Sequence, residues 1–390
     1  MDFSFSQEQK ILKDQIIRFS SREIVPRIEE FERQERFDFE SFKRLGEFGI
    51  LGLHFPERYG GSGADIVTTV MAGEALGEAG VDGGLTLSYG AHTFLCADTI
   101  YQHGTEEQKE RYLPKLISGE GIGCMALTEP DAGSDVASIK TKAEKKGSYY
   151  ILNGRKMFIT NGPIADVAVV YARTGPEIGH KGISAFIVEK GTEGFSSGSL
   201  LRKMGVRTSP TSELIFEDCK VPEENLLGRE GDGFRMAMQT VEWDRSALLA
   251  PFVGGMSYVL NRCIRYARER VQFGRVIGAF PAIKEKIVDI KIFIEAARTL
   301  IYRIAYFKDQ GRPINPMESA VAKLFVGDYS LIPANNAVTL HGGYGYCSEY
   351  MVERYFRDSR LAPIGGGTSE IQKMIIAKAL KDGWKRWTLR

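Results

Sequence analysis

Hydrophobic residues near the start of the chain recur at the spacing of an amphipathic helix. They follow the tetrapeptide SQEQ at residues 6–9, which has the form of a helix capping box. The apolar positions are Ile11, Leu12, Ile16, Phe19 and Ile24. Residues 105–108 repeat the capping pattern before residues 109–117, and residues 68–77 are also typical of a helix. Residues 1–120 are therefore predicted to form an N-terminal helical domain.

Between residues 121 and 228 the pattern changes to short β-prone runs separated by Gly, Pro and charged residues. Residues 148–152 and 155–160 are two such runs, and Asn153-Gly154 between them is the strongest short signal for a hairpin turn. Further runs cover residues 167–172, 182–188 and 213–216. The pattern predicts a small antiparallel barrel or sandwich as a middle domain that ends near Gly228.

Long amphipathic stretches from about Phe234 onward predict helices again. Residues 246–270, 282–308 and 317–340 are each long enough to cross a bundle, and Gly311-Arg312-Pro313 separates the second stretch from the third. A fourth helix is expected over residues 369–380, with Thr368 or Ser369 as its N-cap. The sequence thus predicts a C-terminal four-helix bundle over residues 229–390, and an α+β fold in three domains.

Charge and composition exclude several classes of protein. The chain has 390 residues, 43% of them hydrophobic, and 51 Lys and Arg stand against 50 Asp and Glu, so no strong global field favours nucleic acid or an anionic membrane. The five cysteines form no CxxC pair, which indicates reduced thiols, and the five histidines lack ligand spacing, so no metal site is expected. Neither a signal peptide at residues 1–5 nor a membrane-spanning apolar run is found. We therefore expect a soluble, cytoplasmic protein.

Three consecutive glycines precede the last predicted helix. Gly365, Gly366, Gly367 and Thr368 offer backbone N–H groups at a helix N-terminus, a setting that suits a phosphate or another negative group. The chain has no strand-associated GxGxxG fingerprint and no phosphate-binding P-loop, so a Rossmann nicotinamide site and a P-loop nucleotidase are disfavoured. From these residues alone, an anion site and a simple tight loop both stay open.

Four further segments carry side chains suited to a dinucleotide that contains a planar heterocycle. Residues 127–135 read LTEPDAGSD and residues 156–162 read KMFITNG, which supply hydroxyls for ring carbonyl and N–H groups and an aromatic side chain, Phe158, for packing. Residues 268–274 read RERVQFG, where Arg270 offers a bidentate fork for a pyrophosphate. Residues 341–346 read HGGYGY. Alone, the first segment also fits a Pro/Gly/Asp turn and the second fits a plain strand.

Together with the glycine loop, these segments resemble acyl-CoA dehydrogenases in order and position, nearest in pattern to the isovaleryl-CoA type. The resemblance implies the family's α–β–α fold with a middle antiparallel β-barrel, FAD as cofactor, a homotetramer built from dimers, and electron-transferring flavoprotein as acceptor. In this family the arginine and phenylalanine of the RxQFG turn reach the FAD of a neighbouring subunit. By resemblance, the FAD-binding residues are Leu127, Thr128, Gly133, Ser134, Phe158, Thr160, Arg270, Phe273, Thr339, Gly343, Thr368 and Glu370. The substrate-binding residues are Tyr89, Ser134, Glu242, Arg245 and Gly367.

The chain departs from the family pattern at three of these positions. Many members have tryptophan where Phe158 stands, so an indole N–H donor is lost while ring packing is kept. Thr339 replaces the usual glutamine, and His341 replaces the usual aromatic residue. These two changes weaken the expected contacts with the adenine half of FAD.

The catalytic base is expected at Asp244. Many members of the family place a glutamate where Gly366 stands, whereas residues 241–245 (VEWDR) resemble the segment in which the isovaleryl type carries its base. Desaturation of a thioester needs a base for the α-proton and a hydride acceptor on the opposite face. By resemblance, the backbone N–H at the position of Gly366 polarises the thioester carbonyl, a role that a glycine can keep. A salt bridge between Asp244 and Arg245 is the competing interpretation.

The loss of a side chain at position 366 leaves room beside the reacting carbon. We therefore expect a short branched or alicyclic acyl-CoA, such as isovaleryl or cyclohexanecarboxyl. One alternative is an acyl group tethered to a carrier protein, and another is a flavoprotein that binds without catalysis. If the base lies elsewhere, Asp82, Asp98 and Glu370 are the next candidates.

Overall fold

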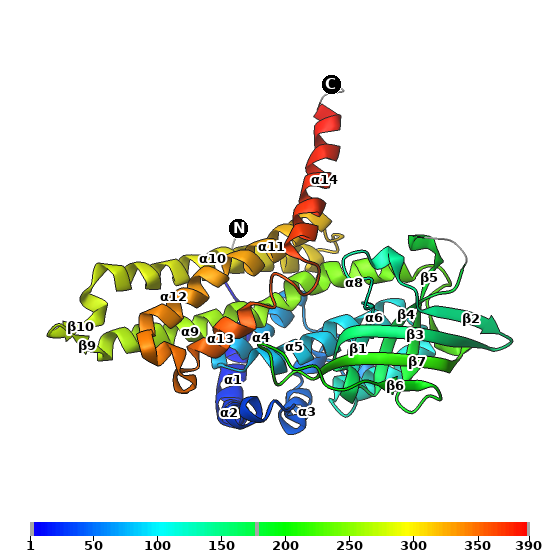
Figure 1. The fold of residues 1–390 in the computed structure, drawn as a ribbon, viewed down its shortest axis with the longest axis horizontal. Helices are drawn as coiled ribbons and strands as arrows, with labels where there is room; N and C mark the ends of the chain where they lie inside the picture. Colours follow the sequence, from blue (N-terminus) through cyan, green and yellow to red (C-terminus); the bar gives the residue numbers. More distant parts are fainter. Residues whose placement is uncertain (1–3, 176–178, 388–390) are drawn as a thin grey trace.

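The N-terminal part of the chain is helical. A computed structural model describes residues 4–175 and 179–387, so residues 1–3 of the N-terminal stretch considered above lie outside it (Figure 1). The helices are α1 Gln7–Glu23, α2 Val25–Gln34, α3 Phe39–Glu47, α4 Ile66–Ala79, α5 Gly83–Gly90, α6 Asp98–His103 and α7 Glu106–Ile117. A π-helical segment, Ala91–Ala97, joins α5 to α6. Both predicted capping boxes form, at Ser6 before α1 and at Thr105 before α7.

The middle of the chain forms one eight-stranded sheet at one end of the molecule (Figure 1). Its strands are β1 Gly123–Ala126, β2 Lys142–Lys146, β3 Tyr149–Thr160, β4 Val167–Arg173, β5 Ile183–Glu189, β6 Phe195–Ser197, β7 Thr211–Pro222 and β8 Leu226–Leu227. The order is β6-β7-β3-β2-β4-β5-β8, with β1 beside β4. The pairings are antiparallel, as expected, except that β1 and a single position of β2 pair in parallel with β4.

The prediction of a hairpin turn at Asn153-Gly154 is wrong. Strand β3 runs through both residues, and its hairpin with β2 turns at Gly147-Ser148 instead. The pair forms an irregularity in the register with β7, where the Asn153 side chain accepts a hydrogen bond from the Asp218 N–H at 2.8 Å. Gly154 has φ 150°, and an added Cβ would lie 2.7 Å from Thr141 Cα. Gly154 therefore allows a β-bulge in which the backbone passes close to Thr141, and it does not form a turn.

The C-terminal part is helical again, with two breaks that the sequence analysis did not include. Its helices are α8 Gly233–Ala247, α9 Leu249–Glu269, α10 Pro281–Asp309, α11 Pro316–Tyr329, α12 Leu331–His341, α13 Val352–Ser359 and α14 Ser369–Trp387. The stretches predicted as single helices over 246–270 and 317–340 are divided at Leu248 and Ser330. In each case a proline, Pro251 or Pro333, stands four residues after the end of the preceding helix. A proline ring clashes with the carbonyl four residues earlier, so an uninterrupted helix is disfavoured there.

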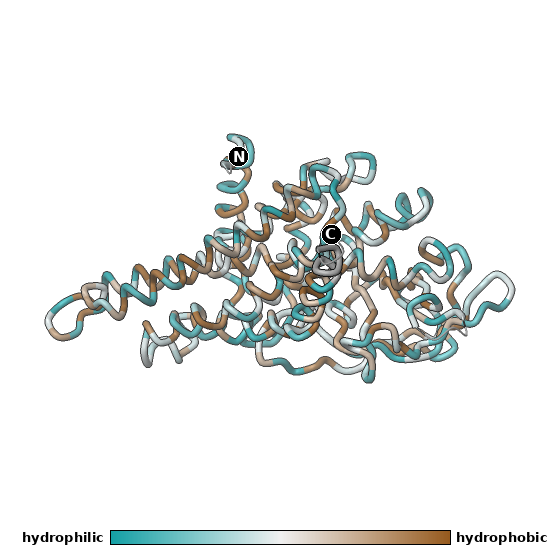
Figure 2. Tube along the Cα trace, turned by 90° about the horizontal axis from the view of Figure 1, so that it is seen from above, coloured by the Kyte–Doolittle hydropathy of each residue, from teal (hydrophilic) through white to brown (hydrophobic). Residues whose placement is uncertain are grey.

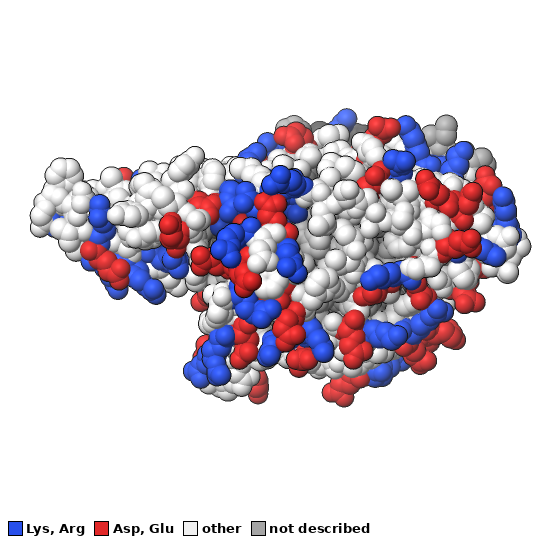
Figure 3. Space-filling view, turned by 60° about the horizontal axis from the view of Figure 1, so that its bottom comes forward, with Lys and Arg blue, Asp and Glu red and all other residues white. Residues whose placement is uncertain are grey.

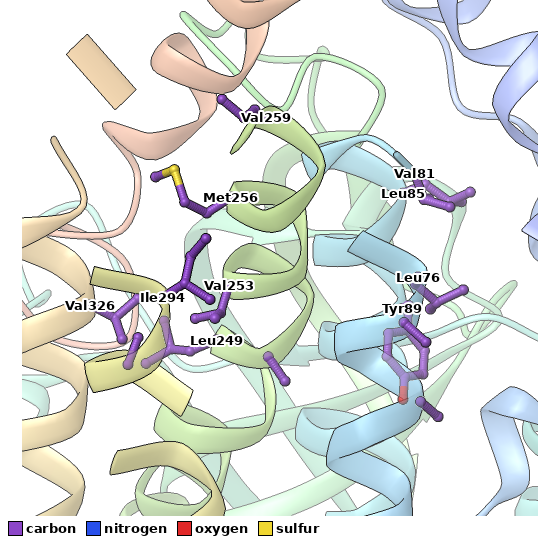
Figure 4. Packing of buried hydrophobic residues seen from close by; sticks show 14 of the residues in the cluster. Leu76, Val81, Leu85, Tyr89, Leu249, Val253, Met256, Val259, Ile294 and Val326 are labelled. Atoms are coloured by element: carbon purple, nitrogen blue, oxygen red, sulfur yellow. The ribbon is translucent and has the colours of Figure 1, made fainter. Parts of the chain in front are cut away.

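Helix α9 is the centre of the hydrophobic core. Leu249, Val253 and Met256 of α9 face Ile294 of α10 and Val326 of α11 in Figure 4, and residues of α4 and α5 cover its other side. Helices α8 and α9 together contain a window of mean hydropathy 1.3, long and apolar enough to span a membrane by composition, yet 61% of that window is buried in the protein. The apolar character of this stretch thus matches its place in the core.

Two elements extend from the body. Helices α9 and α10 form an arm that ends in the short hairpin of β9 Val271–Gln272 and β10 Arg275–Val276 (Figure 1). Figure 2 shows hydrophobic and hydrophilic residues alternating along this arm. Helix α14 contacts α11 and then leaves the body (Figure 1). Its start agrees with the prediction, because the Thr368 hydroxyl accepts a hydrogen bond from the Ile371 N–H at 3.4 Å, as an N-cap does.

Candidate active site

A cavity of about 1170 Å³ lies where the three parts of the chain meet. Its walls come from α5 and the following π-helical segment, the loop after β1, the end of β3, helices α8 and α9, and the loop before α14. Apolar side chains such as Leu87, Leu95, Val241 and Leu248 line it beside a few polar groups. A large, mostly apolar hollow with converging polar groups is typical of a small-molecule site.

Asp244 is the carboxylate placed best to act as a base in this cavity. It lies on α8, only 3% of its surface is exposed, and Oδ1 has no hydrogen-bond partner among the described residues. Burial raises the pKa of Asp244 to about 7, and the charge of Arg245 opposes this rise. A carboxyl group with such a pKa can accept a proton near neutral pH.

Gly366 lies next to Asp244 on the wall of the cavity. A Cβ added to Gly366 would lie 4.0 Å from Asp244 Oδ2, and no other atom comes within that distance except its chain neighbours. Both residues line the cavity. The two positions considered for the base are therefore neighbours in space. A side chain at position 366 would extend into the same part of the cavity as the Asp244 carboxylate.

Two side chains hold the glycine loop from behind. Arg245 Nε donates to the Gly366 carbonyl oxygen at 3.0 Å, and Gln372 Nε2 donates to the carbonyl oxygens of Gly367 at 3.0 Å and Gly366 at 3.4 Å. Arg245 acts on Asp244 only through its charge, with no hydrogen bond between the two side chains among the described residues. The sequence analysis did not single out Gln372; its position one turn into α14, after the N-cap, was the available signal.

A buried ion pair fixes the loop after β1. Lys156 on β3 is fully buried, and its Nζ lies 2.7 Å from Glu129 Oε1 and 3.1 Å from the Leu127 carbonyl oxygen. Glu129 also accepts hydrogen bonds from the N–H groups of Lys140 and Thr141. Buried charges are stable only when paired and hydrogen-bonded in this way. The pair joins the loop at residues 127–129 firmly to β3.

Phe158 projects into the cavity because β3 bulges. The register with β7 shifts between Lys156 and Ile159, and Phe158 has φ 60°, which is uncommon for a residue with a side chain. Its ring is 63% exposed and lines the cavity next to Thr128 and Thr160. An exposed flat ring beside two hydroxyls fits a planar, polar-edged heterocycle.

Comparison with known proteins decides the family. Three domain models match the chain: acyl-CoA dehydrogenase N-terminal domain over residues 6–120, middle domain over 124–219 and C-terminal domain over 231–381. The chain belongs to the acyl-CoA dehydrogenase family. It is 43% identical to the short-chain specific acyl-CoA dehydrogenase of Clostridium acetobutylicum, over 97% of this chain and 99% of that protein. It is also 43% identical to the mitochondrial isovaleryl-CoA dehydrogenase of Solanum tuberosum, over 96% of this chain and 91% of that protein.

Solved structures of this family share the fold. Butyryl-CoA dehydrogenase from Megasphaera elsdenii has a TM-score of 0.94 at 40% identity, covering 97% of this chain and all of that chain. The prolyl acyl carrier protein oxidase AnaB has a TM-score of 0.94 at 38% identity with the same coverage. The FAD complex of PigA has a TM-score of 0.94 at 35% identity, covering 98% and 99%. The three-domain acyl-CoA dehydrogenase fold expected from the sequence is thereby confirmed.

The acyl-CoA dehydrogenase fold gathers most of the expected site residues in the cavity. Its lining includes Leu127, Thr128, Gly133, Ser134, Phe158, Thr160, Glu242, Asp244, Arg245, Gly366, Gly367 and Thr368. Tyr89 does not line it: the ring is fully buried in the core against Phe94. Glu370 is exposed on the first turn of α14, also outside the lining.

Four expected FAD-binding residues lie away from this cavity, near the outer end of the arm. Arg270 directly precedes the β9–β10 hairpin, Phe273 lies in its turn, and Thr339 and Gly343 lie at the end of α12 and just after it. Phe273 is 94% exposed, and the Arg270 guanidinium lies 5.6 Å from the centre of the Tyr344 ring. Within one chain these residues do not contribute to the cavity.

The other candidate bases are held in structural contacts. Asp82 caps α5, where its carboxylate accepts hydrogen bonds from the Gly84 and Leu85 N–H groups. Asp98 is buried outside the cavity lining, and its carboxylate lies 3.2 Å from His54 Nε2. These contacts leave Asp244 as the buried carboxylate with a free oxygen in the described part of the cavity.

Proposed function

We propose that this acyl-CoA dehydrogenase removes the α-proton and β-hydride of a short branched or alicyclic acyl thioester, with Asp244 as the base. One observation carries the proposal: Asp244 is buried in the cavity, has a pKa of about 7 and faces Gly366. The protein acts as an oxidoreductase on CH–CH groups, like the named dehydrogenases that it resembles.

The chain supplies the groups that such a reaction requires. Asp244 takes the α-proton, because its ionised form is available near neutral pH. The N–H groups of Gly366 and Gly367 have no acceptor among the described residues, so they are free to donate to the thioester oxygen as enolate charge grows. Apolar walls at Leu87, Leu95 and Leu248 exclude water from the reacting carbons.

The cofactor is FAD, which accepts the β-hydride when bound. Phe158, Thr160 and the loop at residues 127–134 would hold its ring, and Thr368 would bind beside it at the start of α14. Support comes from the bulge that exposes Phe158 and from the buried ion pair that fixes the loop. The structure provides no group of three His, Cys, Asp or Glu residues, within its described ranges, that could hold a metal ion.

A homotetramer built from dimers completes the cofactor site in this proposal. Arg270, Phe273, Thr339 and Gly343 would reach the FAD of a neighbouring subunit, with electron-transferring flavoprotein as acceptor and a cytoplasmic location. The arm supports an interface, because Val271, Phe273, Val288 and Ile292 are exposed apolar residues there. Figure 3 shows few charged side chains on the outer part of the arm, whereas both signs alternate over the body.

The second candidate keeps the chemistry but takes the acyl group from a carrier protein. The specific observation in its favour is the likeness to the prolyl acyl carrier protein oxidase AnaB, at a TM-score of 0.94. Both kinds of thioester deliver the acyl group on a pantetheine arm, so the second candidate uses the same cavity and the same proposed base.

Anaerobic bleaching of the flavin tests both candidates. The purified protein is mixed with isovaleryl, cyclohexanecarboxyl and straight-chain thioesters, each on CoA and on a carrier protein. We expect branched or cyclic thioesters to bleach the flavin fastest, and Asp244→Asn to slow single-turnover reduction by about 10²- to 10⁴-fold. Asp98→Asn is the matched control, because it changes a buried aspartate outside the cavity.

Three outcomes contradict parts of the proposal. Faster bleaching by carrier-bound thioesters would favour the second candidate. Reduction near the wild-type rate in Asp244→Asn would move the base to Asp82 or Glu370. No bleaching by any thioester, with FAD retained, would identify a flavoprotein that binds without catalysis.

A companion variant returns the carboxylate to the commoner position. Gly366→Glu in the Asp244→Asn background should recover part of the activity toward straight-chain thioesters and exclude branched ones, because the new side chain refills the space beside Asp244. Gly366 has φ 65°, so the substitution carries a backbone cost of about 1–2 kcal/mol. Thermal unfolding of the double variant separates this cost from any failure of catalysis.

A further inference from the structure

In the glycine loop, residues 365–367, the N–H groups of Gly366 and Gly367 are free within the described chain, whereas their carbonyl oxygens accept hydrogen bonds from side chains. The N–H groups of Gly366 and Gly367 have no acceptor among the described residues, and both residues line the cavity. Their carbonyl oxygens point to Arg245 and Gln372, which donate to them at 3.0 to 3.4 Å. The loop is thus held by its acceptors while its donors stay available.

Holding a carbonyl oxygen also sets the direction of the next N–H group. All peptide bonds of the described chain are trans, so each C=O and the following N–H lie in one plane and point in opposite directions. The hydrogen bonds to Gly366 O therefore orient the Gly367 N–H, and the hydrogen bond from Gln372 to Gly367 O orients the Thr368 N–H. Two consecutive glycines would otherwise sample a wide range of conformations.

Gln372 is the neutral member of this pair of holding side chains. It is fully buried, it contacts both glycine carbonyls through one nitrogen, and it does not line the cavity. Arg245 lines the cavity and also affects the pKa of Asp244, so its replacement would change several properties at once. A change at Gln372 reports on loop orientation alone.

We infer that Gln372 is a positioning residue that holds the loop at Gly366 and Gly367 in the conformation that presents its free N–H groups to the thioester carbonyl. This inference rests on the proposed function and deepens it. Donors placed in advance stabilise developing negative charge without reorganisation during the reaction. Gln372 acts through the backbone and touches neither substrate nor cofactor.

The matched pair Gln372→Met and Gln108→Met tests this role. Gln108 is also a buried glutamine whose Nε2 donates to two backbone carbonyls, those of Glu224 at 2.8 Å and Leu226 at 3.0 Å, but it lies outside the cavity. Gln108→Met loses these two contacts and also the capping-box hydrogen bond from the Thr105 N–H, so a general loss of stability affects the control at least as much. Gln372→Glu is a second variant of the same shape that also lacks the donor at neutral pH.

The first measurement is the carbonyl stretch of a bound thioester labelled with ¹³C at C1, recorded by infrared difference spectroscopy on the FAD-loaded protein. Wild type and Gln108→Met should shift the band to lower frequency, because the donors weaken the carbonyl bond. Gln372→Met and Gln372→Glu should lose most of this shift. This readout needs no catalytic turnover and therefore does not depend on Asp244.

The second measurement is single-turnover flavin reduction over a range of thioester concentrations. We expect Gln372→Met and Gln372→Glu to lower the limiting rate by about 10- to 100-fold, while the concentration that gives the half-maximal rate changes less than about threefold, since the donors act mainly in the transition state. A wild-type band and rate in the Gln372 variants would overturn the inference and leave the proposed function intact. An unshifted band in wild type would overturn the donor role itself, whereas failure of Asp244→Asn to slow reduction would count only against the proposed base.

Discussion

At the scale of single residues, the proposed base is Asp244 on α8, in place of a carboxylate that would extend from the glycine loop. Asp244 Oδ2 lies 4.0 Å from where a Cβ at Gly366 would stand, so the two positions open onto one region of the cavity. An aspartate can serve there because burial gives it a pKa of about 7. The short side chain and the absent one together leave space for a substituent on the acyl group.

The raised pKa predicts how the reaction depends on pH. The base works in its ionised form, so flavin reduction at low thioester concentration should rise about tenfold per pH unit below 7 and level off above it. Asp244→Asn should lack this dependence. Stopped-flow reduction across about pH 5 to 9 checks it, and a rate independent of pH in wild type would contradict the assignment.

The same shift has the opposite effect on stability. Between the ordinary pKa of an aspartate, 3.8, and the folded value of about 7, the folded protein keeps a proton that the unfolded chain has lost. The contribution of Asp244 to the free energy of unfolding therefore falls as pH rises through this window. Without ligand, the Asp244→Asn variant should therefore have a higher melting temperature than wild type at about pH 8 and a similar one at about pH 4.

The sequence indicated Asp244 and Gly366 through a resemblance, but it could not indicate Gln372 or Lys156. A glutamine and a lysine in amphipathic segments usually face water, and their burial depends on which carbonyls the folded chain brings near them. Gln372 is buried because the loop before α14 folds back over its own helix. Such contacts arise only from tertiary structure.

At the scale of elements, the helices were predictable and their interruptions were less so. The capping boxes at Ser6 and Thr105 use contacts within four residues, and both form as predicted. The breaks at Leu248 and Ser330 follow from Pro251 and Pro333, whose rings clash with the carbonyls four residues earlier, so proline positions in the sequence carry this signal. The prediction of a turn at Asn153-Gly154 was wrong because these residues form a bulge against β7, which lies far along the chain.

The buried ion pair between β3 and the loop after β1 predicts a large loss of stability. Lys156→Met should lower the free energy of unfolding by about 3–5 kcal/mol, because Glu129 would keep a buried charge without its partner. Adding Glu129→Gln should recover much of this loss. Chemical denaturation of both variants measures the effect, and equal stability of the single and double variants would show that the charge itself is unimportant.

At the scale of the whole molecule, the arm places Arg270 far from the cavity of its own chain. If it serves the FAD of a neighbouring subunit, Arg270→Ala should weaken FAD binding by about 10- to 100-fold, because the pyrophosphate loses a paired donor. Arg268→Ala, at an exposed position on the same helix, is the control. The ratio of flavin to protein absorbance after gel filtration reports retention, and full retention in Arg270→Ala would contradict the shared site.

The three domains meet around one cavity, so ligand binding in that cavity is coupled to the stability of the contacts between the domains. No single domain encloses the hollow, so its ligands bind only where α5, β3 and α8 keep their native relation. By mass action, every molecule bound there adds to the cost of separating these elements. Cofactor and thioester therefore stabilise the contacts between the domains, and in a cell short of flavin this enzyme would be both colourless and easier to unfold.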